Sequence, residues 1–423
     1  MKKIIVIAYY FAPLAGAGAL RPLKLCKYLP AYGWSPYVLT VKNPDWHYAG
    51  DDQLLKEIPP RAKIFRTWML RSVWLYRILN PLRMRRWDSF LKRYVIHPED
   101  QIGWLPLAVL KAITLAKQDH IDAVFSTSGP LTSHLIAYVL FKRFGIPWIA
   151  DFRDEWFENP DLPLPTPLHR HLHYNLEARI VRTASMVITA APVFSHFLSK
   201  HCPRDPKFET ITMGFDPDDY NYADSSYYRP NDKFTVTFSG LFYGSFRPDH
   251  LLRVVNILIE QERIQRDTVC LRFIGANSPR DLREPDPHGI CEFTGFLPHK
   301  QALKLARQSD ALLLLLSRER GKDVIPSKTF EYMALKKPVL AVVPDDGEVA
   351  KIVRETGIGL VADFDDVHQI EQAFCQMYQQ WATGSLSIHP SAEAIKQYSY
   401  VNLTERIALL LDRITKNASE ANS

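Results

Sequence analysis

The chain lacks several features that would assign it to a special class of protein. Its 423 residues include only five cysteines, which are scattered and form no CxxC pair and no Cys/His group with zinc-site spacing. We therefore expect no disulfide framework and a reduced, cytoplasmic setting. No apolar run approaches the roughly 18 residues that a membrane-spanning helix needs. The short apolar start, which ends in a Pro/Gly loop, is not expected to be a signal peptide.

Internal repeats and low-complexity tracts are also missing, as are a GxGxxG motif and a DxD motif in a metal-ready setting. The remaining composition is ordinary, with 47% hydrophobic and 23% charged residues, and the length predicts two or three globular domains. A formal net charge of +6 permits anionic partners such as sugar nucleotides, lipid head groups or nucleic acid. Nucleic acid is the poorest fit, because no binding motif accompanies the charge.

The most informative stretch runs from Asp323 to Pro338 and reads DVIPSKTFEYMALKKP. Six apolar residues without alternation, 311–316, precede it and predict a strand buried on both faces. A helix-start signal follows at Pro326, with Ser327 able to cap the free amides. Residues 339–343 read as the next buried strand. The pattern predicts a βαβ unit with its polar loop at the carboxyl edge of a parallel sheet.

That edge is where open parallel sheets bind ligands, and a helix start suits a phosphate. Lys328 adds a full charge in the first turn. Glu331 lies on the same helix face, where its carboxylate would accept hydrogen bonds from sugar hydroxyls, and Asp323 would flank the ligand from the loop. From spacing alone, an exposed Lys328–Glu331 pair on a surface helix is an equally good interpretation.

In the N-terminal half, small and polar residues also follow successive predicted strands. Gly16 comes after strand 4–9 and would let the backbone approach a ligand, although a plain tight turn explains it equally well. His134 falls in a first helical turn after strand 123–125. The polar run from Asp151 follows strand 148–150. A lone histidine is more often a surface or satisfied residue, and that alternative stays open on spacing alone.

Residues 66–93 differ in character from the rest of the chain. They carry eight Lys/Arg and three tryptophans against a single acid, Asp88. Basic residues interleaved with aromatic ones suit an anionic membrane interface. A basic helical insertion whose aromatic side chains pack inward is the alternative.

The sequence IPSKTFEYMA at 325–334, followed by KPVL at 337–340, resembles the donor-site signature of family 4 glycosyltransferases, which are retaining enzymes of the GT-B architecture. The resemblance implies that Glu331 holds the ribose of the nucleotide. It also implies that Asp323, in place of the first glutamate of an E-x7-E motif, lies against the transferred sugar. Residues 291–298 resemble the loop that contacts the base, with Phe296 and Leu297 beside it.

Two further donor contacts follow from the same resemblance. In the family, an arginine follows a glycine that matches Gly240, and a lysine comes six residues later; both hold the diphosphate. This chain has Leu241 at the first place and Arg247 at the second, so Arg247 and Lys328 are expected to bind the diphosphate. Gly16 matches the glycine beside the donor diphosphate and the acceptor.

The segments SGPLTSHL at 128–135 and PWIADFRDEW at 147–156 resemble the acceptor-domain signature of this family. The resemblance implies that His134 faces the sugar-transfer site as a catalytic residue, with Asp323 on the donor side. Asp151, Arg153 and Asp154 are then expected near the acceptor.

We therefore expect an α/β fold of GT-B type, with two doubly wound Rossmann-like domains facing across a cleft. The acceptor-binding domain would span 1–205, with a helix at 400–418 crossing back to it, and the donor-binding domain 206–399. The expected function is retaining transfer of a sugar from a nucleoside diphosphate sugar, without a metal or other cofactor. The acceptor hydroxyl would belong to a glycan or lipid-linked glycan in cell-surface polysaccharide or glycolipid biosynthesis, with peripheral attachment to the inner membrane.

Two other functions remain open from the sequence. One is a nucleotide-sugar epimerase of the same architecture. The other is a catalytically inactive nucleotide-sugar-binding module.

Overall fold

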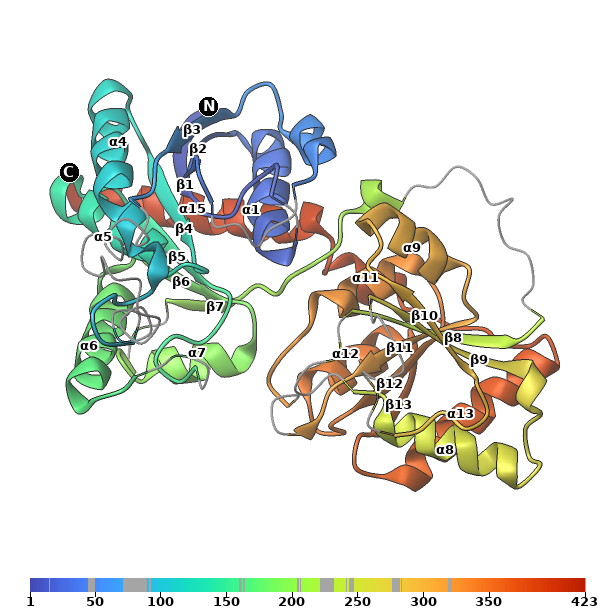
Figure 1. Cartoon of the computed structure of the whole chain (residues 1–423). Helices are drawn as coiled ribbons and strands as arrows, with labels where there is room; N and C mark the ends of the chain where they lie inside the picture. The colour runs from blue at the N-terminus through green and yellow to red at the C-terminus, as the bar shows by residue number, and fades with distance from the viewer. Residues whose placement is uncertain are drawn as a thin grey trace. The chain divides into compact units, whose positions relative to one another are not determined.

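The chain consists of two α/β units in a computed structural model (Figure 1). Unit 1 comprises Met1–Thr212 with Tyr400–Ser423, and unit 2 comprises Met213–Ser399. The structure describes residues 1–14, 16–44, 50–70, 90, 93–159, 162, 164–203, 205, 207–220, 232–240, 242, 247–275, 282, 284–318 and 322–422. The boundary predicted at 205 precedes strand β7 (Phe208–Thr210), which pairs with β6 (Met186–Thr189), so the sheet of unit 1 extends beyond it.

Unit 1 is built on a parallel sheet of seven strands in the order β3-β2-β1-β4-β5-β6-β7. Besides β6 and β7, these strands are β1 (Lys2–Ile7), β2 (Trp34–Val41), β3 (Lys63–Thr67), β4 (Ala123–Thr127) and β5 (Trp148–Phe152). Every residue of β4 and β5 is buried, as expected for parallel strands covered on both faces.

Helices cover both faces of this sheet (Figure 1). One face packs against α1 (Ala17–Tyr28) and α15 (Tyr400–Asn422), so the C-terminal helix belongs to unit 1. The other face packs against α4 (Leu105–Gln118), α5 (Thr132–Phe144) and α6 (Pro167–Thr183). The shorter elements are η1 (Leu29–Tyr32), η2 (Asp52–Glu57), η3 (Asp100–Trp104) and α7 (Pro192–Ser199).

Unit 2 repeats the arrangement with six parallel strands in the order β10-β9-β8-β11-β12-β13. The strands are β8 (Phe234–Ser239), β9 (Val269–Ile274), β10 (Cys291–Gly295), β11 (Ala311–Leu315), β12 (Val339–Val343) and β13 (Gly359–Asp363). Helices α8 (Asp249–Glu260) and α13 (Val367–Ala382) cover one face. Helices α9 (His299–Arg307), α11 (Ser327–Leu335) and α12 (Glu348–Thr356) cover the other. The two helix-covered parallel sheets confirm the predicted α/β fold.

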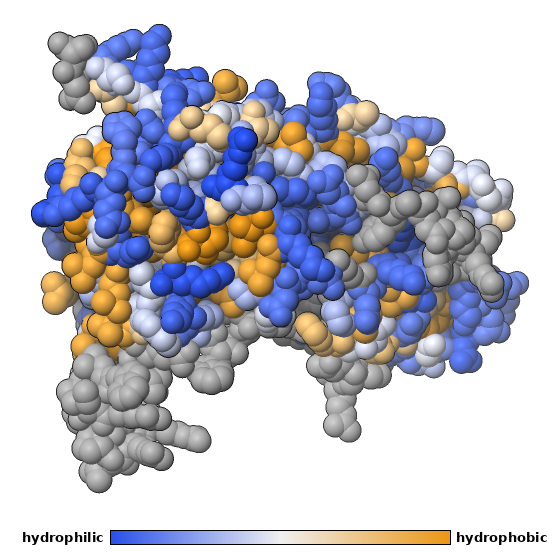
Figure 2. Space-filling view, turned by 90° about the horizontal axis from the view of Figure 1, so that it is seen from above, coloured by the Kyte–Doolittle hydropathy of each residue, from blue (hydrophilic) through white to orange (hydrophobic). Residues whose placement is uncertain are grey.

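One property of the helices and one of the surface also bear on function. None of the described helices is long and apolar enough to cross a membrane. On the face drawn in Figure 2, hydrophilic side chains predominate, and hydrophobic ones gather in smaller areas between them.

Candidate functional site

The β11–α11–β12 segment of unit 2 forms the βαβ unit that the sequence predicts. Pro326 takes the N-cap position of α11 with extended backbone, and no side chain caps the helix. The expectation that Ser327 caps it is therefore wrong, because Ser327 is the first helical residue. The Thr329 amide donates to the Pro326 carbonyl at 3.0 Å, so the amides of Ser327 and Lys328 begin the helix at the carboxyl edge of the sheet.

Glycines end the three neighbouring strands of this edge. Gly240, Gly275 and Gly295 follow or close β8, β9 and β10 with φ values of 146°, 101° and 66°. The amide of Gly240 donates to the Ile274 carbonyl at 2.7 Å, and the amide of Gly275 donates to the Gly295 carbonyl at 2.9 Å. A Cβ on Gly275 would lie 3.0 Å from the Gly240 oxygen. Side chains are thus excluded here, and the backbone itself lines the edge.

Lys328 brings a cation to this glycine-lined edge. Its Nζ lies 4.0 Å from the ring centroid of Phe238. A Cβ added to Gly240 would come within 2.7 Å of the same atom. Burial lowers the pKa of Lys328 to about 8, against the opposing charge of Glu331. An anion bound at this edge would recover the charge that burial disfavours.

Glu331 and Asp323 lie at the same end of unit 2 as half-buried carboxylates. Within the described part of the chain, neither side chain takes part in a hydrogen bond or an ion pair. The exposed Lys328–Glu331 pair, the alternative open from spacing, is therefore not formed. Both carboxylates are available to accept hydrogen bonds from a ligand.

Three other residues are predicted to contact the donor, namely Arg247, Phe296 and Leu297. Arg247 Nε donates to Asp249 Oδ2 at 2.9 Å, so its charge is already paired at the start of α8. Leu241, which stands where the family has a phosphate-binding arginine, lies outside the described residues. Phe296 is 78% exposed, and the neighbouring Leu297 packs partly into the core beneath α11 and α12.

In unit 1, Arg153 directly follows β5 and ties the loop after β4 to the first turn of α1. Its guanidinium donates to the carbonyls of Ser128 and Gly129, and Nη1 donates to the Gly18 carbonyl at 2.7 Å. Its backbone amide donates to Ser128 Oγ at 2.8 Å. These bonds give Arg153 a part in positioning the backbone around it, and its role near the acceptor stays a prediction.

Asp151 is fully buried and pairs with Arg21 of α1. Arg21 Nε and Nη2 donate to the two carboxylate oxygens at 2.9 and 2.7 Å, and Thr127 Oγ1 donates to one of them at 2.8 Å. Arg21 also donates to the carbonyls of Ile211 and Thr212. Asp151 thus anchors α1 to β5, and its role near the acceptor stays a prediction.

His134 is also fully buried, in the first turn of α5. Trp148 Nε1 donates to Ser126 Oγ at 2.7 Å, and Ser126 Oγ lies 2.7 Å from His134 Nδ1. Nε2 of the ring is buried and has no hydrogen-bond partner among the described residues, and burial lowers the pKa of His134 to about 3. The ring packs 4.4 Å from Phe152. His134 is thus a buried histidine of low pKa, and its role as a catalytic group stays a prediction.

Two predicted residues of unit 1 remain accessible. Asp154 is exposed and forms no hydrogen bond or ion pair with the residues that the structure describes. Gly16 is the N-cap of α1 with φ 104°, and a Cβ there would meet nothing within 4 Å. Its positive φ is the feature that requires glycine.

Most of the basic aromatic stretch 66–93 lies outside the described residues, namely 71–89 and 91–92. At its start, Trp68 is exposed, with Lys42 Nζ 4.7 Å from its ring centroid. The prediction of membrane attachment through this stretch stays a prediction.

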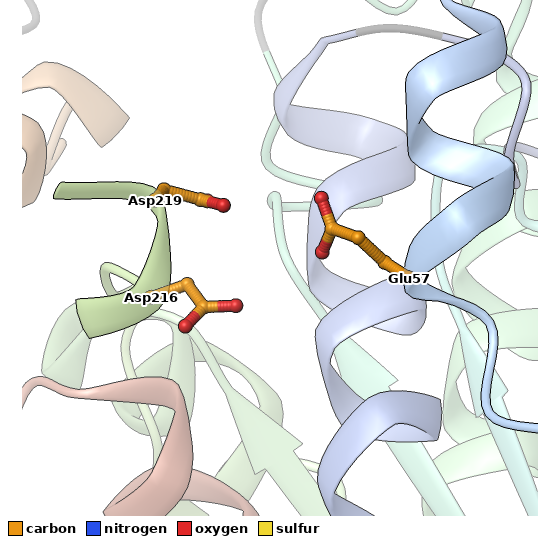
Figure 3. Close-up of side chains that lie close together, drawn as sticks. All are labelled: Glu57, Asp216 and Asp219. Atoms are coloured by element: carbon orange, nitrogen blue, oxygen red, sulfur yellow. The ribbon is translucent and has the colours of Figure 1, made fainter. Parts of the chain in front are cut away.

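Figure 3 draws three carboxylates that the sequence does not single out, Glu57, Asp216 and Asp219. Glu57 ends η2 in unit 1 and pairs with Lys24 of α1 at 2.5 Å. In unit 2, Asp216 accepts a hydrogen bond from the Asp218 amide at the start of η4 (Pro217–Tyr220). Because the three carboxylates are divided between the two units, they are assigned no joint role.

One protein family matches part of unit 2. Residues 233–380, from β8 to within α13, match the family described as "Glycosyl transferases group 1". No curated protein matches the chain.

Solved structures match nearly the whole chain. The sucrose-phosphate synthase of Thermosynechococcus elongatus is 14% identical with a TM-score of 0.63, over 99% of this chain and all of that one. The chain has the GT-B glycosyltransferase fold. The Anabaena protein HepE in complex with UDP and glucose is 14% identical with a TM-score of 0.60, over 98% of this chain and all of that one. The UDP-forming trehalose-phosphate synthase of Burkholderia xenovorans is 11% identical with a TM-score of 0.62, over 97% and 100%.

Within this GT-B fold, the burial of His134 makes a testable prediction about acid stability. A histidine whose pKa drops from 6.5 to about 3 on folding takes up a proton only in the unfolded state between those values. The unfolding free energy should therefore fall as the pH drops below about 6.5, by about 1.4 kcal/mol per pH unit for this group. Urea unfolding of wild-type and His134→Gln protein at several pH values measures the slope.

We expect His134→Gln to reduce that slope by the contribution of one proton, about 1.4 kcal/mol per pH unit. The matched control is His120→Gln, because the His120 side chain is 89% exposed. An unchanged slope in His134→Gln, or an equal reduction in the control, would contradict the neutral buried state of His134.

Proposed function

We propose that the chain is a glycosyltransferase that moves a sugar from a nucleoside diphosphate sugar to an acceptor hydroxyl, with retention of configuration. The observation that carries this proposal is Lys328, a half-buried cation held against a backbone edge made of glycines and an uncapped helix start. Such an edge recognises phosphate groups. The family match over the same unit and the UDP-bound Anabaena structure support this assignment.

The donor contacts then follow from the positions in unit 2. Lys328 and the first amides of α11 bind the diphosphate. Glu331, one turn further along α11, accepts hydrogen bonds from the ribose hydroxyls, and Asp323 on the preceding loop lies toward the transferred sugar. The exposed ring of Phe296 offers a stacking surface to the base. Arg247 contributes only if a phosphate replaces Asp249 as its partner.

The chemical step requires stabilisation of the leaving diphosphate. The bond from the anomeric carbon to the diphosphate oxygen breaks, and the acceptor oxygen bonds to the same face of that carbon. The acceptor proton passes to a phosphate oxygen. Fixed positive groups stabilise the charge that develops on the leaving group, so the proposal includes no metal or other cofactor.

Unit 1 is proposed to take the acceptor, a hydroxyl of a glycan or of a lipid-linked glycan in the synthesis of a cell-surface polysaccharide or glycolipid. Asp154 is its candidate contact, because its side chain is exposed at the end of β5. A screen of nucleotide sugars for thermal stabilisation, followed by product analysis with and without acceptors, tests the proposal. Conversion of a nucleotide sugar in the absence of any acceptor would indicate an epimerase instead.

Glu331→Gln should weaken binding of the nucleoside diphosphate by about 5- to 100-fold. A half-buried carboxylate that accepts hydrogen bonds from ligand hydroxyls contributes about 1–3 kcal/mol, and the neutral amide of glutamine accepts such bonds more weakly. Isothermal titration of the diphosphate measures the change. Glu393→Gln, at an exposed position on α14 (Ala392–Lys396) of the same unit, is the control and should bind normally. Equal affinity in Glu331→Gln and the control would reject the ribose contact.

A further inference from the structure

A second surface of unit 1 lies where α6 meets the chain segment that leads into η3. His169 Nε2 lies 3.1 Å from the Tyr94 carbonyl oxygen, and His97 Nδ1 lies 3.0 Å from His173 Nε2. These contacts join residues more than seventy positions apart in the sequence. The segment is therefore held on the first half of α6.

A directional chain of hydrogen bonds fixes this junction. Trp156 Nε1 donates to His173 Nδ1 at 3.1 Å, so the hydrogen of His173 lies on Nε2 and is donated to His97 Nδ1. His97 Nε2 then donates to the Arg93 carbonyl at 3.2 Å. Each neutral ring accepts on one nitrogen and donates on the other. These hydrogen bonds therefore fix the position of the segment on α6, and with it the position of the neighbouring side chains.

Apolar side chains gather at the outer side of this junction, each 38–74% exposed. We call them the α6 patch: Phe90, Tyr94, Val95, Leu168 and Leu172. Leu168 and Leu172 are one turn apart on α6, and the rings of Phe90 and Tyr94 lie 4.9 Å apart. Clustered exposed apolar side chains of this kind mark an interaction surface.

The charges around the α6 patch have one sign. Arg179 continues the stripe of Leu168 and Leu172 along α6, and Arg93 precedes Tyr94; both arginines are exposed. Among the described residues of 90–96 and of α6, the sole acid is Glu177. Glu177 is buried and engaged with His201 at 2.7 Å. The described residues of these two segments therefore present apolar and cationic side chains to solvent.

We propose that the α6 patch docks unit 1 on the interface of an anionic phospholipid bilayer. Aromatic and leucine side chains enter the boundary between head groups and acyl chains, while arginines beside them attract anionic head groups. The proposal goes beyond the proposed function, because glycosyl transfer does not require a membrane surface, and it adds α6 to the membrane contact that the sequence predicts for residues 66–93. It would also bring a lipid-linked acceptor to the unit expected to bind it.

Co-sedimentation with phosphatidylglycerol and phosphatidylcholine vesicles, without nucleotide sugar, tests the proposal. Wild-type protein should bind the anionic vesicles at low salt and dissociate at high salt. The double variant Leu168→Gln/Leu172→Gln should bind them about ten-fold or more weakly. Arg93→Gln/Arg179→Gln should lose binding to anionic vesicles and show a weaker salt dependence.

The matched control is Leu110→Gln/Leu409→Gln. These leucines of α4 and α15 are each 62% exposed in the same unit, and their replacement should leave vesicle binding unchanged. Absence of wild-type binding at low salt, or equal loss in both leucine variants, overturns the proposal. So does light scattering that shows a dimer broken only by Leu168→Gln/Leu172→Gln, which would assign the patch to a second copy. Because no donor is present, failure here leaves the proposed reaction unaffected.

Discussion

Replacing Asp151 with asparagine should destabilise unit 1 by about 3–5 kcal/mol. The substitution leaves the buried guanidinium of Arg21, 3% exposed, without its only described carboxylate partner. Removal of one member of a buried ion pair is costly, because the remaining charge keeps its desolvation penalty. Urea unfolding followed by fluorescence measures the loss.

The matched control for this prediction is Asp412→Asn. Asp412 pairs with Lys2 at 2.8 Å on the surface, with side chains 48% and 45% exposed, so its replacement should cost less than about 1 kcal/mol. A similar small loss for Asp151→Asn would show that the pair is not structural. If Asp151 instead contacted the acceptor, the variant would keep its stability and lose transfer activity.

Replacing Lys328 with methionine should weaken binding of a nucleoside diphosphate by about 10- to 100-fold and leave binding of the bare nucleoside unchanged. The change removes the cation beside Gly240 while preserving an apolar side chain against Phe238. A hydrogen bond to a charged group contributes about 1.5–3 kcal/mol. The control is Lys322→Met, because Lys322 is an exposed cation of the preceding loop that pairs with Asp346.

The pH dependence of binding gives an independent test of the same cation. Because the pKa of Lys328 is about 8 in the free protein and a bound diphosphate would raise it, the affinity should be full below pH 8 and fall above it. Lys328→Arg should remove this fall, since arginine stays charged. An identical pH profile in the wild type and in Lys328→Arg would exclude Lys328 as the phosphate cation.

Several elements were predictable from local patterns. Apolar runs without alternation predict β11 and β12, because both faces of a parallel strand are covered. Pro326, fixed in φ, marks the start of α11 correctly. The same reasoning placed the N-cap one residue too late. The N-cap is the last residue before the helix, and Pro326, which has extended backbone, takes that position instead of Ser327.

The residues that form the candidate site were harder to predict from the sequence. Spacing placed Lys328, Glu331 and Asp323 near one ligand, and all three lie at the glycine-lined end of unit 2 or on the loop before α11. Gly275 and Gly295 were missed in this role, although Gly275 directly follows β9 and Gly295 closes β10. A glycine at the end of a predicted strand was the sequence feature that could have identified them.

The sequence alone determined the α/β class, most strand and helix positions, and the polar residues that end successive parallel strands, because these depend on neighbours along the chain. Only the tertiary structure decided what those residues do. Asp151 is buried against Arg21, which is 130 positions away, and Arg153 reaches Gly18, which is 135 positions away. Whether a polar side chain meets solvent, a ligand or a buried partner depends on such distant contacts, and local spacing contains no information about them.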